Sequence, residues 1–166
     1  MFLIRLLAAA ALCLLVSCSS TPKVSGAGYR GPSAAIVNND VVPPDSVPSS
    51  VRRAIYAANN INHLPYQFGG GHGRPCYGLD CSGSVSHVLR NAGFINDSMP
   101  SKGFQKYGKS GPGKYITIYS RDGHVFMTIC GVRFDTTSGG SGHVGPRWML
   151  KPRSTKGFTV RHPEGV

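Results

Sequence analysis

The sequence predicts a single α+β domain in which two N-terminal helices pack on a small antiparallel sheet. The chain of 166 residues is long enough for one domain with its own core. Apolar residues recur with the helical period in the first part of the chain, and with a period of two after residue 114. A run of helices followed by a run of strands is typical of the α+β class.

Residues 1–17 are predicted to be a lipoprotein signal peptide. Arg5 precedes an apolar stretch, Leu6–Val16, which is too short to span a bilayer. The stretch ends in Leu-Val-Ser-Cys, which resembles a bacterial lipoprotein cleavage box and makes Cys18 the expected lipidation site. An ordinary secretory signal or an uncleaved anchor is the alternative. We therefore expect a protein of the cell envelope, held to a membrane by its N-terminal lipid. Because Ser19 replaces the aspartate that retains some lipoproteins at the inner membrane, we expect the outer membrane, facing the periplasm, in a cell with two membranes.

Residues 18–49 are predicted to be a flexible tether, and residues 50–166 the folded domain. The tether segment is rich in Ser, Gly, Pro and Asn and shows no sustained period of apolar residues.

The chain is strongly basic, with 18 Lys and Arg against 7 Asp and Glu, and a net charge of +11. Such a charge attracts polyanions over a long range without identifying them. Export argues against nucleic acid as the partner and leaves phospholipid headgroups, acidic polysaccharides and the carboxylate-bearing cell wall. The sequence gives no indication of an oligomeric state.

Two helices are predicted before the sheet. The first covers residues 51–61 and follows a pair of serines at 49 and 50 that suits an N-cap. The second begins between Cys81 and Ser84, after a glycine-rich loop, and ends at Gly93, a favoured C-cap residue. The apolar residues of both helices follow the 3.6-residue period: Val51, Ala54, Ile55 and Ala58 in the first, and Val85, Val88, Leu89 and Ala92 in the second.

Four strands are predicted, over residues 115–119, 123–129, 132–136 and 158–161. A two-residue turn at Cys130 and Gly131 would join the second and third strands into a hairpin. In that register the apolar residues share one face: Val125, Met127, Ile129, Val132 and Phe134. His124 and Asp135 share the other face as diagonal neighbours, so the carboxylate can hold the imidazole.

Cys81 is the candidate nucleophile. A cysteine at a helix N-terminus meets unpaired N–H groups and the positive end of the helix dipole, which both favour the thiolate. Cys76 lies in the preceding loop and gains no such help. With Cys130, the folded part holds three cysteines, so at least one is a free thiol. A buried or disulfide-bonded cysteine is the more common interpretation of Cys81 taken alone. The histidines and cysteines lack paired metal-ligand spacing, so neither a metal nor a cofactor is expected.

Acyl transfer by cysteine needs a thiolate, an imidazole and a group that orients the imidazole. Cys81, His124 and Asp135 supply these groups in that order. His143, in a glycine-rich loop, is the competitor for the orienting role. The remaining histidines are expected to be surface or packing residues: His63, His72, His87 and His162.

Three segments together resemble the NlpC-type cell-wall cysteine peptidases, which are papain-like. They are Tyr66-Gln67-Phe68-Gly69-Gly70, Asp80-Cys81-Ser82-Gly83 and Gly123-His124-Val125. The resemblance covers about residues 50–150. It implies a papain-like fold and hydrolysis of peptidoglycan stem peptides, commonly at the bond between D-glutamate and diaminopimelate. It also implies that Asp80 and Ser82 contact substrate, and that Tyr66 lines the site beside the thiolate.

The chain departs from this family at three places, one of which is Gly145-Pro146-Arg147-Trp148, a segment outside the general pattern. Asp135 stands one residue short of the usual third catalytic position, which is commonly a histidine. Residues 113–116 replace the usual Pro-Gly-Asp-Leu segment. Two other functions therefore remain open: a papain-like acyltransferase, and a non-catalytic lipoprotein that binds the cell wall. The presence of both Cys81 and His124 argues against the second, because binding alone needs neither.

Overall fold

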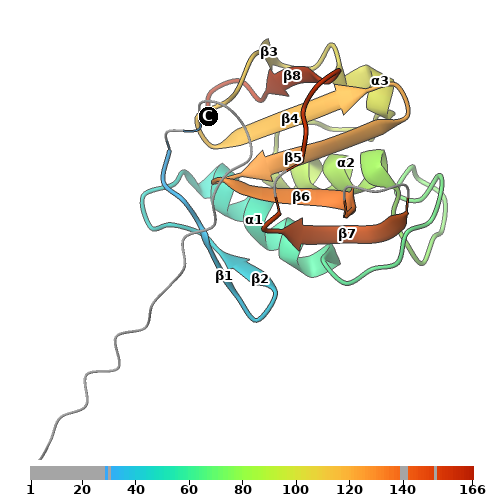
Figure 1. The fold of residues 1–166 in the computed structure, drawn as a ribbon, viewed down its shortest axis with the longest axis horizontal. Helices are drawn as coiled ribbons and strands as arrows, with labels where there is room; N and C mark the ends of the chain where they lie inside the picture. Colours follow the sequence, from blue (N-terminus) through green and yellow to red (C-terminus); the bar gives the residue numbers. More distant parts are fainter. Residues whose placement is uncertain (1–28, 30, 139–141, 152) are drawn as a thin grey trace, which may run out of the picture.

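The computed structural model describes residues 29, 31–138, 142–151 and 153–166. The predicted signal peptide, Cys18 and the first part of the predicted tether lie outside the described residues. Within them, a six-stranded antiparallel sheet has the strand order β3-β8-β4-β5-β6-β7, and helices α1 and α2 cover one of its faces (Figure 1). None of the described helices has the length and apolar character needed to cross a membrane.

Both predicted helices are present. Helix α1 (Ser49–Ile61) begins after Pro48, which occupies the N-cap without a side-chain bond, so the two serines lie in the first turn instead of capping it. Proline suits this position because it fixes φ and has no N–H to satisfy. Helix α2 (Cys81–Ala92) ends at Gly93 in the left-handed conformation, as predicted. The two apolar faces pack together against the sheet and are buried.

Part of the segment predicted to be a tether is folded in the structure. Strands β1 (Ala35–Val37) and β2 (Asp40–Val42) form a hairpin whose two turn residues, Asn38 and Asn39, both have positive φ. Asparagine tolerates that conformation, which a tight hairpin of this kind requires. Val41 packs in the core, and the Asn59 side chain of α1 bonds both its N–H and its carbonyl at 3.0 Å. The hairpin is therefore part of the folded domain.

The central hairpin has the predicted register. Strands β5 (His124–Ile129) and β6 (Val132–Thr137) pair with Met127 opposite Phe134 and Ile129 opposite Val132. Cys130 and Gly131 form the turn, both with positive φ. Every side chain of the two strands is buried, on the polar face as well as on the apolar one. Both faces are therefore covered.

The rest of the sheet includes strands that the sequence did not predict. Strands β4 (Ile116–Arg121) and β8 (Thr159–His162) match predicted strands, whereas β3 (Lys109–Ser110) and β7 (His143–Met149) do not. Strand β7 contains Gly145 and Pro146, which argue against a strand unless it lies at an edge. Strand β7 is an edge strand of this sheet, where glycine and proline are tolerated. The remaining short helix is α3 (Ser101–Phe104).

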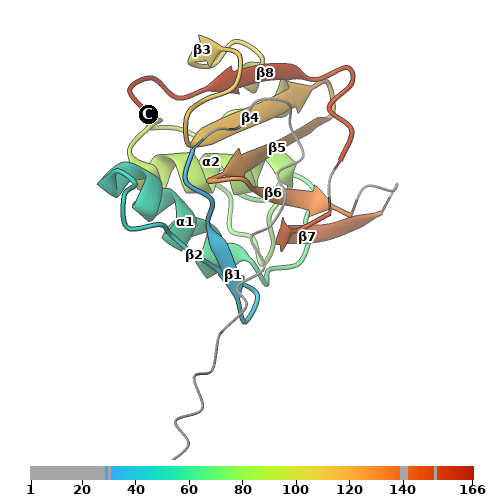
Figure 2. The same cartoon turned by 60° about the vertical axis from the view of Figure 1, so that its left-hand side comes forward.

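The connection between β7 and β8 covers the second face of the sheet. The chain leaves β7 at one edge and returns to β8 beside β4, so the described residues 153–158 cross in front of the sheet, on the side away from α1 and α2 (Figures 1 and 2). The guanidinium of Arg153 lies over the Phe126 ring of β5, 5.0 Å from its centre. This crossing segment buries the face that carries His124 and Asp135.

Candidate active site

Cys81 begins α2 and has only 7% of its surface exposed. The backbone N–H groups of Val125 in β5, and of Ser82 and Cys81 at the start of the helix, each lower the pKa of the Cys81 thiol. Burial raises the pKa of the Cys81 thiol, these N–H groups partly offset the rise, and the Asp80 carboxylate adds to it. The helix N-terminus alone therefore does not favour the thiolate as predicted, because desolvation outweighs it. A thiolate at Cys81 needs a neighbouring cation.

His124 and Asp135 meet on the polar face of the central hairpin, as the predicted register requires. The Nε2 atom of His124 lies 2.9 Å from Oδ1 of Asp135, and both side chains are almost completely buried. The backbone N–H of Thr137 donates a second bond to Oδ1 at 3.2 Å. Burial alone would raise the pKa of Asp135, but its bonds and charge interactions with His124 and Arg153 outweigh burial and lower it. The carboxylate is therefore ionised.

The thiol and the imidazole belong to neighbouring elements. The backbone N–H of Val125, which directly follows His124 in β5, lowers the pKa of the Cys81 thiol and therefore lies close to it. Because Nε2 of His124 faces Asp135, Nδ1 is the ring nitrogen that is turned away from the carboxylate. The three cysteines of the folded part are free thiols; Cys76 is exposed, and Cys130 is buried.

Two arginines that sequence reasoning missed also bind Asp135. Arg133, on the same strand and the same face, places Nη1 at 3.2 Å from Oδ2, and Arg153 places its Nη1 at 2.7 Å from the same oxygen. The i, i+2 spacing in β6 is the signal that would have identified Arg133. Arg153 has no such signal, because it lies 18 positions from Asp135 in a segment without periodicity.

Asp80 organises the loop beside the nucleophile. Its Oδ1 accepts bonds from the Gly83 N–H at 2.7 Å and from the Ser82 hydroxyl at 2.9 Å, and its Oδ2 accepts one from the Gly69 N–H at 3.1 Å. It is thus the N-cap of α2 and ties the glycine-rich loop to the helix. The ring of His72 contacts both Asp80 and Ser82, at 3.3 and 3.1 Å. These side chains, which the resemblance assigns to substrate binding, are largely buried and bonded to one another.

Tyr66 lies near Cys81, and it stacks on His143. The two rings are 3.9 Å apart and almost parallel. Burial raises the pKa of Tyr66 to about 12, and the nearby Cys81 and Asp80 add to the rise. His143 is the first residue of β7 rather than a loop residue, and its ring contact is with Tyr66. Of the two candidates for the orienting role, Asp135 is the one that bonds His124.

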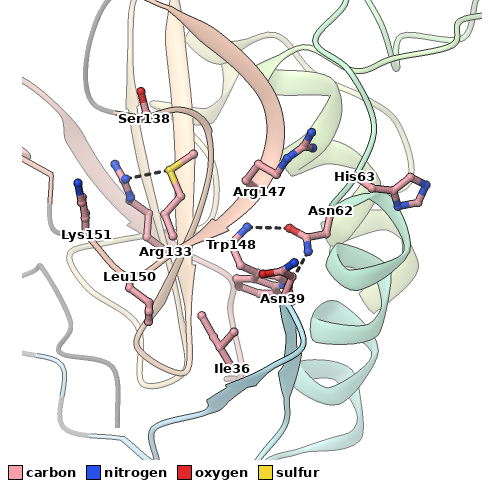
Figure 3. Close-up of a pocket in the computed structure, with 11 residues that line it drawn as sticks. Ile36, Asn39, Asn62, His63, Arg133, Ser138, Arg147, Trp148, Leu150 and Lys151 are labelled. Carbon is pink, nitrogen blue, oxygen red and sulfur yellow. Dashed lines mark hydrogen bonds between the residues drawn. The ribbon is translucent and has the colours of Figure 1, made fainter. Parts of the chain in front are cut away.

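A cavity of about 610 Å³ is lined in part by Arg133, the residue that also bonds Asp135 (Figure 3). The cations Arg133, Arg147 and Lys151 contribute to its lining, together with the ring of Trp148. Arg133 is only 3% exposed, and its second guanidinium nitrogen contacts the Met149 sulfur at 2.9 Å. The surroundings of Asp135 are therefore rich in positive charge.

Comparisons with solved structures show which fold carries this site. The peptidoglycan hydrolase RipB of Mycobacterium tuberculosis matches with a TM-score of 0.51 and 21% identity, over 73% of this chain and 68% of that one. A variant of the Resuscitation Promoting Factor Interacting protein RipA matches with a TM-score of 0.50 and 18% identity, over 87% of this chain and 71% of that one. No protein-family profile and no curated protein sequence matches the chain. The chain therefore shares the α+β fold of these two solved structures.

Proposed function

We propose that this protein is a peptidoglycan hydrolase, a cysteine endopeptidase that cleaves stem peptides with Cys81, His124 and Asp135. The observation that carries the proposal is the buried Asp135 carboxylate that bonds the His124 imidazole at 2.9 Å. Support comes from Val125, the residue after His124, whose backbone N–H lowers the pKa of the Cys81 thiol at the start of α2. The fold shared with RipB makes peptidoglycan the favoured substrate class. The family resemblance favours the bond between D-glutamate and diaminopimelate.

The reaction follows from the positions of these atoms. Nδ1 of His124 takes the proton of the Cys81 thiol, and the thiolate attacks the carbonyl carbon of the scissile bond. The tetrahedral adduct collapses, the imidazolium gives its proton to the leaving amine, and the acyl group remains on sulfur. His124 then deprotonates a water molecule, which attacks the thioester and releases the acid and the thiol. Asp135 keeps the ring in place throughout.

The raised pKa of Cys81 gives His124 a specific part in this sequence. Since burial favours the neutral thiol, the thiolate forms only when the proton passes to His124 and the imidazolium balances the charge. Cys81 and His124 therefore ionise together, as a thiolate–imidazolium pair. Removal of either residue should abolish turnover.

The rest of the proposal concerns location. We place the protein in the cell envelope, attached to a membrane through lipid on Cys18, and facing the periplasm from the outer membrane where a cell has two. The net charge of +11 supports attraction to the carboxylate-bearing wall.

Digestion of purified peptidoglycan, with mass spectrometry of the released fragments, tests the function. The wild-type protein should release stem-peptide fragments that carry a new carboxyl group and a new amine, whereas Cys81→Ala and His124→Ala should release none. Cys76→Ser is the matched control, because Cys76 is an exposed thiol outside the site. Fragments joined to an amine or a lipid would show acyl transfer instead. Retention of the protein on the wall without any fragment would show binding alone.

A further inference from the structure

The cavity that Arg133 lines is rich in positive charge (Figure 3). Its described lining includes three cations and no acidic side chain: Arg133, Arg147 and Lys151. Neither Arg147 nor Lys151 forms an ion pair with a described acidic residue. Arg133 shares its counter-ion, Asp135, with Arg153, whose contact is shorter, at 2.7 Å against 3.2 Å. The cavity therefore has a net positive charge, which favours an anionic ligand.

One edge of the Arg133 guanidinium lacks a strong acceptor among the described residues. Nη1 bonds Asp135, which leaves the edge formed by Nε and Nη2. The Nε atom is buried and has no hydrogen-bond partner in the described part of the chain. Nη2 contacts the thioether sulfur of Met149 at 2.9 Å, and a thioether is a weak acceptor. A buried donor without an acceptor costs free energy, which a ligand that supplies the acceptor recovers.

The geometry of this edge suits a carboxylate. Nε and Nη2 of one guanidinium carry two parallel N–H groups, which bond the two oxygens of a planar carboxylate at once. Met149 also lines the cavity, and its unbranched side chain can turn away to leave Nη2 to the ligand. A carboxylate would thus replace a weak acceptor on Nη2 and give Nε the acceptor that it lacks.

Apolar side chains that share this cavity favour a carboxylate with an apolar group beside it. Trp148 and Leu150 belong to the lining, and Leu150 has 56% of its surface exposed. The ring N–H of Trp148 donates to Oδ1 of Asn59 at 2.7 Å, so the ring is held in place before any ligand binds. A free phosphate has no apolar group to cover these side chains. The last residue of a peptide has both a carboxylate and a side chain.

We propose that this cavity binds the terminal carboxylate of a peptide, with Nε and Nη2 of Arg133 bonding its two oxygens. The site is separate from the thiol, since none of Cys81, His124 and Asp135 lines the cavity. Binding goes beyond the proposed function and needs no turnover. Only the source of the peptide rests on that function: an uncleaved stem peptide of the cell wall would be held here while another lies at the thiol.

Intrinsic fluorescence tests the site, because Trp148 lines the cavity and is the only tryptophan of the chain. Titration with N-acetyl-alanyl-leucine should change the Trp148 emission until it saturates. The same peptide with a C-terminal amide, and inorganic phosphate, should have little effect at the same concentrations. The absence of a saturable response to the acid would overturn the proposal. A response to the amide or to phosphate as strong as that to the acid would also overturn it.

Variants of the lining cations give a second test. Arg133→Lys keeps a buried cation but removes the edge with two donors, so the affinity for the acid should fall at least about tenfold. Lys151→Gln removes an exposed charge of the lining and should weaken binding about two- to fivefold. Lys156→Gln, an exposed lysine outside the lining, is the matched control and should change nothing.

Unchanged affinity in a folded Arg133→Lys would refute the proposal. If circular dichroism shows that this variant does not fold, the two exposed lysines decide, and equal affinities in Lys151→Gln and Lys156→Gln would refute it. Binding and cleavage can fail separately. If the acid binds as expected while wild-type protein leaves peptidoglycan intact, the function is wrong and the site stands. If peptidoglycan is cleaved and the acid does not bind, the function stands and the site is wrong.

Discussion

Replacement of Asp135 by alanine should cost stability as well as activity. The carboxylate is 2% exposed and bonds Arg133, Arg153, His124 and the Thr137 N–H. Its removal leaves the guanidinium of Arg133, which is 3% exposed, without its counter-ion. Loss of one partner from a buried ion pair costs about 3–5 kcal/mol. Since the free energy of unfolding of small domains is roughly 5–15 kcal/mol, the variant should still fold, but its free energy of unfolding should be much smaller.

Urea denaturation followed by circular dichroism measures this loss. With a slope of about 2 kcal/mol per molar urea, the midpoint should fall by about 2 M. Asp135→Asn should lose less, because the amide oxygen still accepts hydrogen bonds. The double variant Asp135→Ala/Arg133→Met should regain part of the stability, since the buried cation that lost its partner is gone. A loss below about 1 kcal/mol in the single variant, or no gain in the double variant, would refute this reasoning.

The same carboxylate predicts how stability depends on pH. The pKa of Asp135 in the folded protein lies below its ordinary value, since its bonds to His124 and Arg153 outweigh burial. Its contribution is therefore complete above the ordinary aspartate pKa of about 3.9, and is lost as the pH falls toward the lower folded value. The difference in unfolding free energy between wild type and Asp135→Asn should be constant near neutral pH and shrink below about pH 4. A difference that grows on acidification would contradict the direction of the shift.

Three further predictions follow from other parts of the chain. Cys18→Ala should move the protein from the membrane fraction to the soluble fraction, and continued membrane association would contradict lipidation. Iodoacetamide near neutral pH should label Cys81 faster than Cys76, and this order should reverse in His124→Ala; a disulfide between the two cysteines in active protein would exclude Cys81 as the nucleophile. Gly83→Ala should cost about 1–3 kcal/mol in a thermal melt, because the new Cβ would overlap the Gly70 carbonyl. An unchanged melting temperature would show that the loop can move away.

The central part of the site could be predicted from sequence because it depends on contacts between residues that are close together in the chain. The alternation of apolar residues, which Phe126 alone interrupts, indicates the register of β5 and β6, and this register brings His124 to Asp135. A helix with a clear apolar period places Cys81 at its first residue. These features depend on residues within about a dozen positions of one another, and apolar periodicity over that range can be recognised in a single sequence.

The electrostatics of the site could not be predicted in the same way. Arg153 reaches His124 across 29 positions from a segment with no period, and its position depends on the crossing of the whole sheet. The raised pKa of Cys81 depends on burial, which the helix N-terminus does not reveal. The hairpin before α1 was missed for another reason. Its strands have three residues each, too few to show a period, and only the asparagine pair at the turn marks them.

If lipid on Cys18 holds the protein to a membrane, as proposed, the N-terminal hairpin limits the distance between the domain and that membrane. Ala34 is buried and its N–H bonds the carbonyl of Cys130, so the folded part begins at least 15 residues before α1. If Cys18 carries lipid, only residues 19–33 separate the anchor from the domain, instead of residues 19–49. A flexible chain of the shorter length spans about 20 Å, against about 30 Å for the longer one. A domain held so close could act only on the layer of cell wall nearest to its own membrane.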